Sequence, residues 1–222
     1  MNVNFVSSSL RVVVACVLLT ALTALSACGS VAVPTDHWFR LQAPTTPPAG
    51  VPPLDAPRAG ILRVLRPTLA ATVAPDRLMR SEGPVRMQPY EFLRWSGPLD
   101  EMVADTFVTA ASRAKYFASV KNAGDPGAED LQLATRVVEF HHVVDGDTWN
   151  ARVVVELRLT APSDGTLFFH EEFAVDVPIT GRDADDVVVG LSQGIGRVAT
   201  LALQRARDEG ALGAVAAGPA GR

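Results

Sequence analysis

Cysteine is almost absent from this sequence: Cys16 and Cys28 are the only two among 222 residues, and both lie near its start. The rest of the chain can therefore build neither a disulfide framework nor a thiolate metal cluster. Clusters of lysine and arginine are also lacking, and acidic residues outnumber basic ones by 24 to 20. This charge pattern argues against binding of nucleic acid and against electrostatic adhesion to anionic lipid.

Signatures of catalysis are missing as well. The sequence has no G-x-S-x-G motif, no P-loop and no cysteine–histidine pair that could support nucleophilic catalysis. Gly194 to Ala199 spell a dinucleotide-like GxGxxA, but they fall inside a predicted helix, where no phosphate would meet a helix N-terminus. Close approach of this helix to the sheet or to a neighbouring subunit is the better reason for these glycines. We therefore expect a protein without enzymatic activity and without a cofactor.

Histidine and acidic residues gather in a few places, which raises the question of a metal site. His141 and His142 precede Asp145 and Asp147, but neighbouring strand residues point to opposite faces, so both imidazoles cannot easily reach one ion. We expect surface or half-buried histidines near a turn, and no bound metal. Two other polar groups give the same answer: His170 with Glu171 and Glu172, and the acidic Asp183, Asp185 and Asp186, which form a helix cap.

An apolar run near the start of the chain decides the compartment. Arg11 is followed by 14 almost purely apolar residues, Val12 to Leu25. As a helix they would span about 21 Å, less than the roughly 30 Å of a hydrocarbon core. The run ends in Leu25-Ser26-Ala27-Cys28, which resembles a bacterial lipobox. We interpret residues 1–27 as a cleaved lipoprotein signal peptide and Cys28 as the lipidated residue, with an ordinary secretory signal as the alternative.

Proline dominates the stretch that follows. Seven prolines lie between Pro34 and Pro57, and such sequence favours extended polyproline conformation. His37 to Gln42, which follows Pro34 and precedes the other six prolines, carries two aromatic residues and a leucine and predicts a short strand. Residues 28–60 thus comprise the lipidated N-terminus, a short strand and a proline-rich linker. Whether that linker is a tether or a loop inside the domain stays open.

Residues 61–209 predict one α+β domain, and the Ala/Gly-rich tail 210–222 predicts disorder. The first half contains a strand at Ile61 to Arg66, two short edge strands around a turn at Gly83-Pro84, and a helix through Lys115 capped by Ser96 or Gly97 with Pro98 in its first position. The second half predicts three long strands in a meander and a helix from Asp183 to about Asp208. The predicted fold is an antiparallel sheet with two amphipathic helices on one face. The long strands are Leu131 to Phe140, Trp149 to Thr160 and Thr166 to Val177.

The segment around Trp95 resembles the ABC-type transport auxiliary lipoproteins, the family of the paraquat-inducible-operon lipoprotein. The matching residues are Tyr90, Arg94-Trp95, Ser96-Gly97 and Pro98-Leu99 followed by the amphipathic helix, with support from Cys28, Phe39-Arg40-Leu41 and Phe117 to Val120. Packing in the core is expected for at least two of Tyr90, Phe92 and Trp95.

The resemblance implies a periplasm-facing lipoprotein that works with an MCE-domain protein and with an ABC permease and ATPase, moving phospholipids or other hydrophobic molecules. Gly29 after the acylated cysteine favours the outer membrane. The protein would act as a docking adaptor, with a homo-oligomeric ring as an option and with Arg94 and Trp95 as first candidates for partner contact. The alternatives are an envelope assembly lipoprotein that activates another outer-membrane machine, lipid binding by the domain itself, and hydrolysis of envelope lipids.

Overall fold

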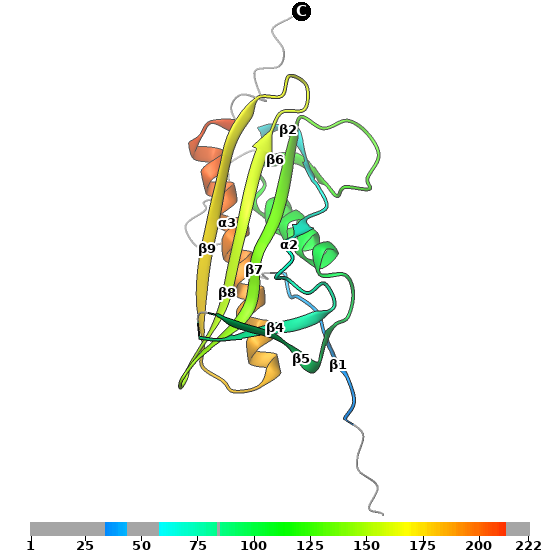
Figure 1. Ribbon diagram of the computed structural model, residues 1–222. Helices are drawn as coiled ribbons and strands as arrows, with labels where there is room; N and C mark the ends of the chain where they lie inside the picture. The colour runs from blue at the N-terminus through cyan, green and yellow to red at the C-terminus, as the bar shows by residue number, and fades with distance from the viewer. Residues whose placement is uncertain (1–33, 44–57, 84, 212–222) are drawn as a thin grey trace, which may run out of the picture. The chain divides into compact units, whose positions relative to one another are not determined.

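The computed structural model describes residues 34–43, 58–83 and 85–211 (Figure 1). The chain divides after Thr35 into two units, and all the helices and strands below belong to the second, Asp36–Arg222. The expected signal peptide, Cys28, nearly all of the proline-rich linker and most of the tail lie outside the described residues. The predicted domain boundaries therefore stay predictions.

One sheet carries the fold, and its central strand is β7. On one side β7 pairs along most of its length with β8, which pairs in turn with β9. On its other side it pairs in succession with β2, β3 and β4, and β4 continues the sheet through β5 to β1. In the described part of the chain the strands are β1 (His37–Phe39), β2 (Arg58–Val64), β3 (Thr68–Leu69), β4 (Arg77–Glu82), β5 (Arg86–Trp95), β6 (Phe117–Lys121), β7 (Leu131–Asp145), β8 (Thr148–Thr160) and β9 (Leu167–Ile179).

The sheet is mixed, which corrects the prediction of an antiparallel sheet. The meander of β7, β8 and β9 is antiparallel as expected, and so is the hairpin of β4 and β5. However, β2, β3 and β4 all run parallel to β7, and β1 runs parallel to β5. The chain between each of β2, β3 and β4 and the strand β7 is long and contains a helix, Leu99–Ala114, and parallel pairing requires such crossovers. The predicted edge strand at Arg77 to Arg80 is β4, which lies inside the sheet.

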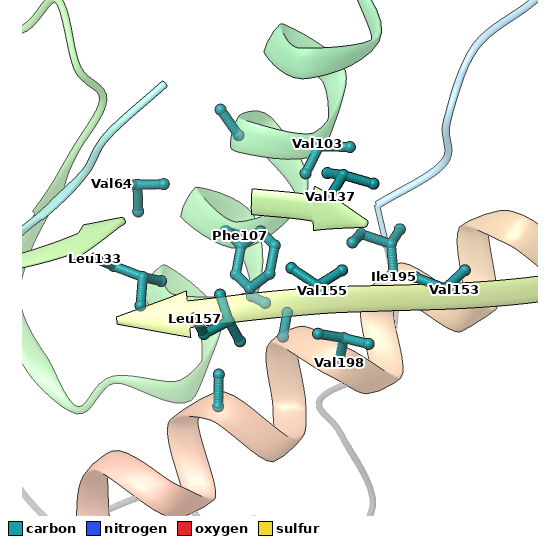
Figure 2. Close-up of a cluster of buried hydrophobic side chains, with 14 of the residues drawn as sticks. Val64, Val103, Phe107, Leu133, Val137, Val153, Val155, Leu157, Ile195 and Val198 are labelled. Atoms are coloured by element: carbon teal, nitrogen blue, oxygen red, sulfur yellow. The ribbon is translucent and has the colours of Figure 1, made fainter. Parts of the chain in front are cut away.

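Two helices, α2 (Leu99–Ala114) and α3 (Ala184–Asp208), contribute to one hydrophobic core with the sheet (Figure 2). The helix α3 begins at the predicted cap: the Asp183 side chain accepts a hydrogen bond from the Asp186 backbone N–H, and the Asp186 side chain accepts one from the Asp183 backbone N–H. The helix α2 begins after Pro98 without a side-chain cap, so the capping role predicted for Ser96 or Gly97 is wrong. The α+β class with two helices is confirmed.

The core lies between the two helices and the central strands. Figure 2 shows Phe107 of α2 and Val198 of α3 around Val155 of β8. Gly194 allows α3 to lie close to the sheet, because a Cβ atom there would sit 2.6 Å from Cγ2 of Val153. This confirms close helix–sheet approach as the reason for that glycine. In the described residues, α3 is the one helix with the length and hydropathy to cross a membrane, but it is mostly buried as a core helix.

Candidate interaction surface

Trp95, the last residue of β5, lies in the core. Its side chain is 2% exposed, and its ring lies 5.9 Å from that of Phe140, centroid to centroid. Tyr90, on the same strand, is partly buried against the core. The prediction that at least two of the three aromatic residues pack in the core is therefore confirmed. Because its indole ring is enclosed, Trp95 can support a surface only by holding β5 in place.

Arg94 points to the opposite side of β5, as alternation along a strand requires. Its side chain is 19% exposed, and its Nε donates a hydrogen bond of 2.9 Å to Oδ2 of Asp36. A second carboxylate, Asp76, lies 3.6 Å from Nη1. Arg94 therefore joins β1 to β5 and to the segment before β4. A minor part of the Arg94 side chain is exposed to solvent, so a partner-binding role for Arg94 stays a prediction that the geometry permits.

The strand β1 adds a residue that the sequence analysis did not single out. In the parallel register of β1 and β5, Phe39 lies beside Trp95, and Trp38 lies beside Arg94. Phe39 packs against the core, whereas Trp38 is 64% exposed. The alternation in His37 to Gln42 predicts the strand, but it does not say which aromatic ring faces solvent. Trp38 and Arg94 together define what we call the β1 corner.

Backbone hydrogen bonds fix the β1 corner to the rest of the domain. The N–H of Ser96 donates to the carbonyl of Phe39 over 2.7 Å, and the N–H of Trp95 donates to the carbonyl of Asp76 over 3.0 Å. Beyond β1, the N–H of Gln42 donates to Oγ of Ser192 on α3 over 3.1 Å. These bonds connect the chain at β1 to the end of β5 and to α3, and they connect β5 to the segment before β4, so the corner is held by ordered parts of the domain.

The sheet face away from the helices carries charged side chains in pairs. Arg152 on β8 donates to Glu139 over 2.8 Å and to Asp176 over 2.9 Å, so it bridges three neighbouring strands. His170 on β9 contacts Glu156 on β8, which also pairs with Arg136. These groups are half-buried or exposed, so their electrostatic contribution is small and sensitive to salt. The sheet face away from the helices is exposed to solvent, as the alternation of β8 predicts.

An open groove of about 750 Å³ lies on that solvent-exposed face, between β7 and the hairpin of β4 and β5. Its lining mixes apolar side chains such as Met87 with polar groups such as Ser81 and Glu139. His141 also lines it and is almost fully buried, with Nδ1 lacking a hydrogen-bond partner. Burial lowers the pKa of His141, although the nearby Glu139 carboxylate opposes that shift. His141 is therefore neutral near pH 7.

His142 faces the helix side and is fully buried, so the prediction of surface or half-buried histidines is wrong for both residues. The strand β7 runs to Asp145 instead of ending at Phe140, so both histidines lie within the strand. Tyr90 Oη lies 2.7 Å from Nδ1 of His142, and the Trp149 ring packs edge-on against the imidazole at 4.4 Å. The two histidines point to opposite faces, as the argument against a shared metal ion assumed.

Two arginines lie next to the aromatic rings that contact His142. The guanidinium of Arg80 lies 5.3 Å from the centre of the Tyr90 ring, and that of Arg182 lies 5.1 Å from the centre of the Trp149 ring. Burial, with the positive charge of Arg80 and weaker effects of His141 and Arg182, lowers the pKa of His142 to about 4. Burial also raises the pKa of Tyr90. The cluster is neutral at its centre, so it stabilises one end of the sheet without carrying charge inside.

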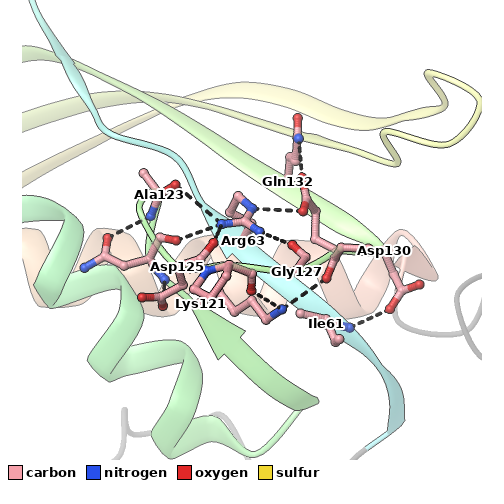
Figure 3. A network of polar contacts seen from close by, with 12 residues as sticks. Ile61, Arg63, Lys121, Ala123, Asp125, Gly127, Asp130 and Gln132 are labelled. Atoms are coloured by element: carbon pink, nitrogen blue, oxygen red, sulfur yellow. Dashed lines mark hydrogen bonds and ion pairs between the residues drawn. The ribbon is translucent and has the colours of Figure 1, made fainter.

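A second polar network orders the long loop between β6 and β7. Arg63 of β2 is buried and donates to four backbone carbonyls, and its Nε lies 2.9 Å from the Glu129 carboxylate (Figure 3). The loop also binds Lys121 through the carbonyls of Pro126 and Ala128. The donors of Arg63 and Lys121 meet backbone carbonyls and one carboxylate of the loop, so the network explains how a loop without strands holds its shape. The carbonyls that accept from Arg63 belong to Asn122, Ala123, Asp125 and Gly127.

The interior between the helices and the sheet is filled. The cavity there, lined by residues such as Phe107 and Leu203, has a volume of about 10 Å³, close to the minimum that holds one water molecule. A lipid acyl chain does not fit in that space. Within residues 34–43, 58–83 and 85–211, no three histidine, cysteine, aspartate or glutamate side chains gather in a way that could hold a metal ion.

Comparison with solved structures shows how widely this fold is shared. Protein XCC0632 from Xanthomonas campestris, assigned to the family DUF330, superimposes with a TM-score of 0.67 at 21% identity, covering 80% of this chain and 99% of that one. The crystal structure of an uncharacterized protein gives 0.60 at 19% identity, covering 77% and 98%. These identities are low, so the likeness establishes the fold alone. The comparison with curated proteins found no match.

The fold and the surface define a single α+β domain with a mixed sheet, a filled core and an exposed corner at β1. The sequence profile of the ABC-type transport auxiliary lipoprotein components matches residues 39–201, which is most of the chain. This chain belongs to that family of ABC-type transport auxiliary lipoproteins, as the resemblance around Trp95 indicates. Membership in a family of lipoproteins indicates a location in the bacterial cell envelope.

Proposed function

We propose that this protein is a non-catalytic docking adaptor of an ABC-type transport system, tethered by lipid at Cys28 and facing the periplasm. The family match over residues 39–201 carries this proposal, because it covers Arg94 of the β1 corner, all of α2 and most of α3. In this role the protein holds other components in place and performs no chemical step. Cys28 supplies the anchor, and the folded domain supplies the contact surface.

The proposal extends to the system that the adaptor serves. We infer an MCE-domain protein with an ABC permease and ATPase as partners, and phospholipids or other hydrophobic molecules as cargo. Gly29 after the acylated cysteine favours the outer membrane as the site of anchoring. The filled core supports an adaptor over a carrier, because the cavity of about 10 Å³ between sheet and helices admits no acyl chain.

The contact surface of the adaptor includes the β1 corner. The Arg94 side chain is partly exposed there, and Asp36 and Asp76 fix its orientation, so less conformational freedom is lost when a partner binds. Trp95 acts from beneath by holding β5. A homo-oligomer is compatible with this arrangement, because β9 and β6 each pair with a single strand among the described residues and leave one edge open.

The test is capture of partners by the full-length acylated protein, solubilised with its neighbouring gene products. We expect the MCE-domain protein and the permease to be retained, and we expect Arg94→Gln to lower the amount retained several-fold. Arg197→Gln, which removes an exposed arginine on α3, is the matched control and should leave retention unchanged. Retention of cell-wall synthases or outer-membrane assembly proteins instead would support the envelope assembly alternative. Equal retention by the two variants would remove Arg94 from the contact surface.

A further inference from the structure

A large aromatic ring stands in solvent at the β1 corner, close in sequence to the expected anchor. Exposed and partly buried residues alternate from Trp38 to Gln42: Phe39 and Leu41 pack against the core, while Trp38 and Arg40 are exposed. Trp38 is 64% exposed. Phe39 and Leu41 already supply the packing that β1 makes with the core, so the fold of the domain does not require the Trp38 ring.

We propose that Trp38, with Arg40 beside it, enters the headgroup region of the membrane that holds the lipid anchor. This inference rests on the proposed acylation of Cys28. Tryptophan concentrates at membrane interfaces because its ring is apolar while its N–H still finds a hydrogen-bond partner among headgroups and water. Arginine near an interface reaches the lipid phosphates with its guanidinium group.

The length of the chain between the anchor and β1 selects a membrane as the occupant. Trp38 follows Cys28 by ten residues, and ten fully extended residues span at most about 36 Å. A lipid at Cys28 therefore keeps Trp38 within that distance of the bilayer at all times, whatever other proteins are present. No other binding partner is held near Trp38 by a covalent tether.

The charges around Trp38 suit a lipid surface. Asp36, the acidic residue nearest to it in sequence, is engaged by Arg94 at 2.9 Å, so its repulsion of anionic headgroups is reduced. Arg40 adds a positive charge on the exposed side of the strand. The sequence has no basic cluster, so binding to anionic lipid by charge alone is weak. The tether supplies the local concentration, and the tryptophan ring sets the orientation.

The experiment reconstitutes the acylated mature protein into vesicles of phosphatidylethanolamine and phosphatidylglycerol. The lipids of the vesicles either carry or lack brominated acyl chains. We expect bromine to quench tryptophan emission and the emission to shift to shorter wavelength when vesicles are added. Trp38→Phe should lose most of both effects, because Trp95 is buried in the core and Trp149 packs against His142. Circular dichroism confirms that the variant is folded, which the exposure of Trp38 leads us to expect.

A relocated tryptophan provides the matched control. Leu201 is exposed on α3, nine residues and about 13 Å along the helix from Ser192, which bonds to the chain just after β1. The double variant Trp38→Phe with Leu201→Trp should show little quenching. Equal quenching of this variant and the wild type would overturn the inference, because the contact would not be specific to β1.

Two further outcomes separate this inference from the proposed function. A blue shift that depends on protein concentration without vesicles would assign Trp38 to contact with a second copy and overturn the membrane contact. Mass spectrometry of the same sample reports the state of Cys28. If Cys28 is acylated and Trp38→Phe is quenched as strongly as the wild type, the membrane contact of Trp38 is refuted and the proposed anchoring is not. Protein with an unmodified Cys28 refutes the proposed anchoring, and with it this inference.

Discussion

The two faces of the sheet differ in what their side chains do, and Trp95 and Trp38 show the difference most clearly. They lie on neighbouring paired strands, one register position apart, yet Trp95 is 2% exposed and Trp38 is 64% exposed. The inner face, covered by α2 and α3, holds the core. The outer face carries ion pairs and the exposed residues of the β1 corner. Stability therefore depends on the inner face, and we propose that recognition by partners and membrane falls to the outer one.

The largest expected effect of a single substitution is on the inner face. Trp95→Ala removes a buried ring that packs against Phe140, and such a change lowers the free energy of unfolding by about 3–5 kcal/mol. Trp38→Ala is the matched control and should change it by less than about 0.5 kcal/mol, because the ring is mostly in solvent. Urea denaturation of the domain measures both values. Similar losses for the two variants would contradict the division between inner and outer face.

The next effect is a dependence of stability on pH that originates largely in the inner face. His142 has a folded pKa of about 4 against about 6.5 in the unfolded chain. The unfolded state therefore binds more protons between pH 6.5 and 4, so stability falls as pH is lowered through that window, by up to about 3 kcal/mol. His141, whose pKa burial also lowers, adds to this trend.

Substitution of the histidine sharpens this prediction. His142→Gln should flatten the pH dependence of the unfolding free energy between pH 7 and 4, although it also lowers stability at pH 7. Gln193→Ala, at an exposed position on α3 that carries no titratable group, is the control and should keep the original slope. Denaturation midpoints at several pH values provide the measurement. An unchanged slope in His142→Gln would show that His142 is not the group that titrates.

On the outer face the expected effects on stability are smaller. Arg152→Gln leaves Glu139 and Asp176 without their shared cation, and we expect a loss of about 1 kcal/mol at low salt. Screening should reduce that loss at 1 M salt, where electrostatic interactions extend only about 3 Å. Thermal unfolding at both salt concentrations tests this. A salt-independent loss would mean that packing of the arginine stem matters more than its charge.

The smallest effect on stability belongs to the β1 corner. Arg94→Gln breaks a partly exposed ion pair with Asp36, and we expect it to lower the unfolding free energy by less than about 1 kcal/mol. The same variant should lower the retention of partners several-fold. Thermal unfolding and partner capture, carried out on the same preparation of the variant, measure the loss of stability and the retention of partners. A large loss of stability with unchanged capture would assign Arg94 to the fold.

Local patterns in the sequence predict the part of the fold that depends on local contacts. The alternation from Trp149 to Thr160 and the turn residues around Gly146 and Gly165 predict the meander, and the cap at Asp183 predicts the start of α3. These signals need only neighbouring residues. The strands of the meander follow one another in the chain, so their pairing is also the simplest connection.

The remainder depends on contacts between distant parts of the chain. The parallel pairing of β2, β3 and β4 with β7 joins segments separated by a helix or a long loop, and no local pattern encodes it. The strand β3 has only two residues, too few for any periodicity. Arg63 looks like an ordinary strand arginine in the sequence, yet it fixes a loop that lies some 60 residues further on.

The candidate site follows the same division. The family motif identifies Arg94 and Trp95 as a pair, and alternation along a strand places them on opposite faces, but only the packing of β5 shows that Trp95 is the one that faces the core. Trp38 belongs to the surface because of the register of β1 and β5, which the sequence does not specify. The burial of His141 and His142 likewise depends on the length of β7 and on side chains from β4 and β5.

The most direct test of a lipid-tethered adaptor is the mass of the N-terminal peptide of protein isolated from its native membranes. A lipid-tethered adaptor has a chain that starts at Cys28 with acyl groups on both its sulfur and its amine. A free thiol at that position, or a chain beginning at a different residue, would contradict the proposed tethering.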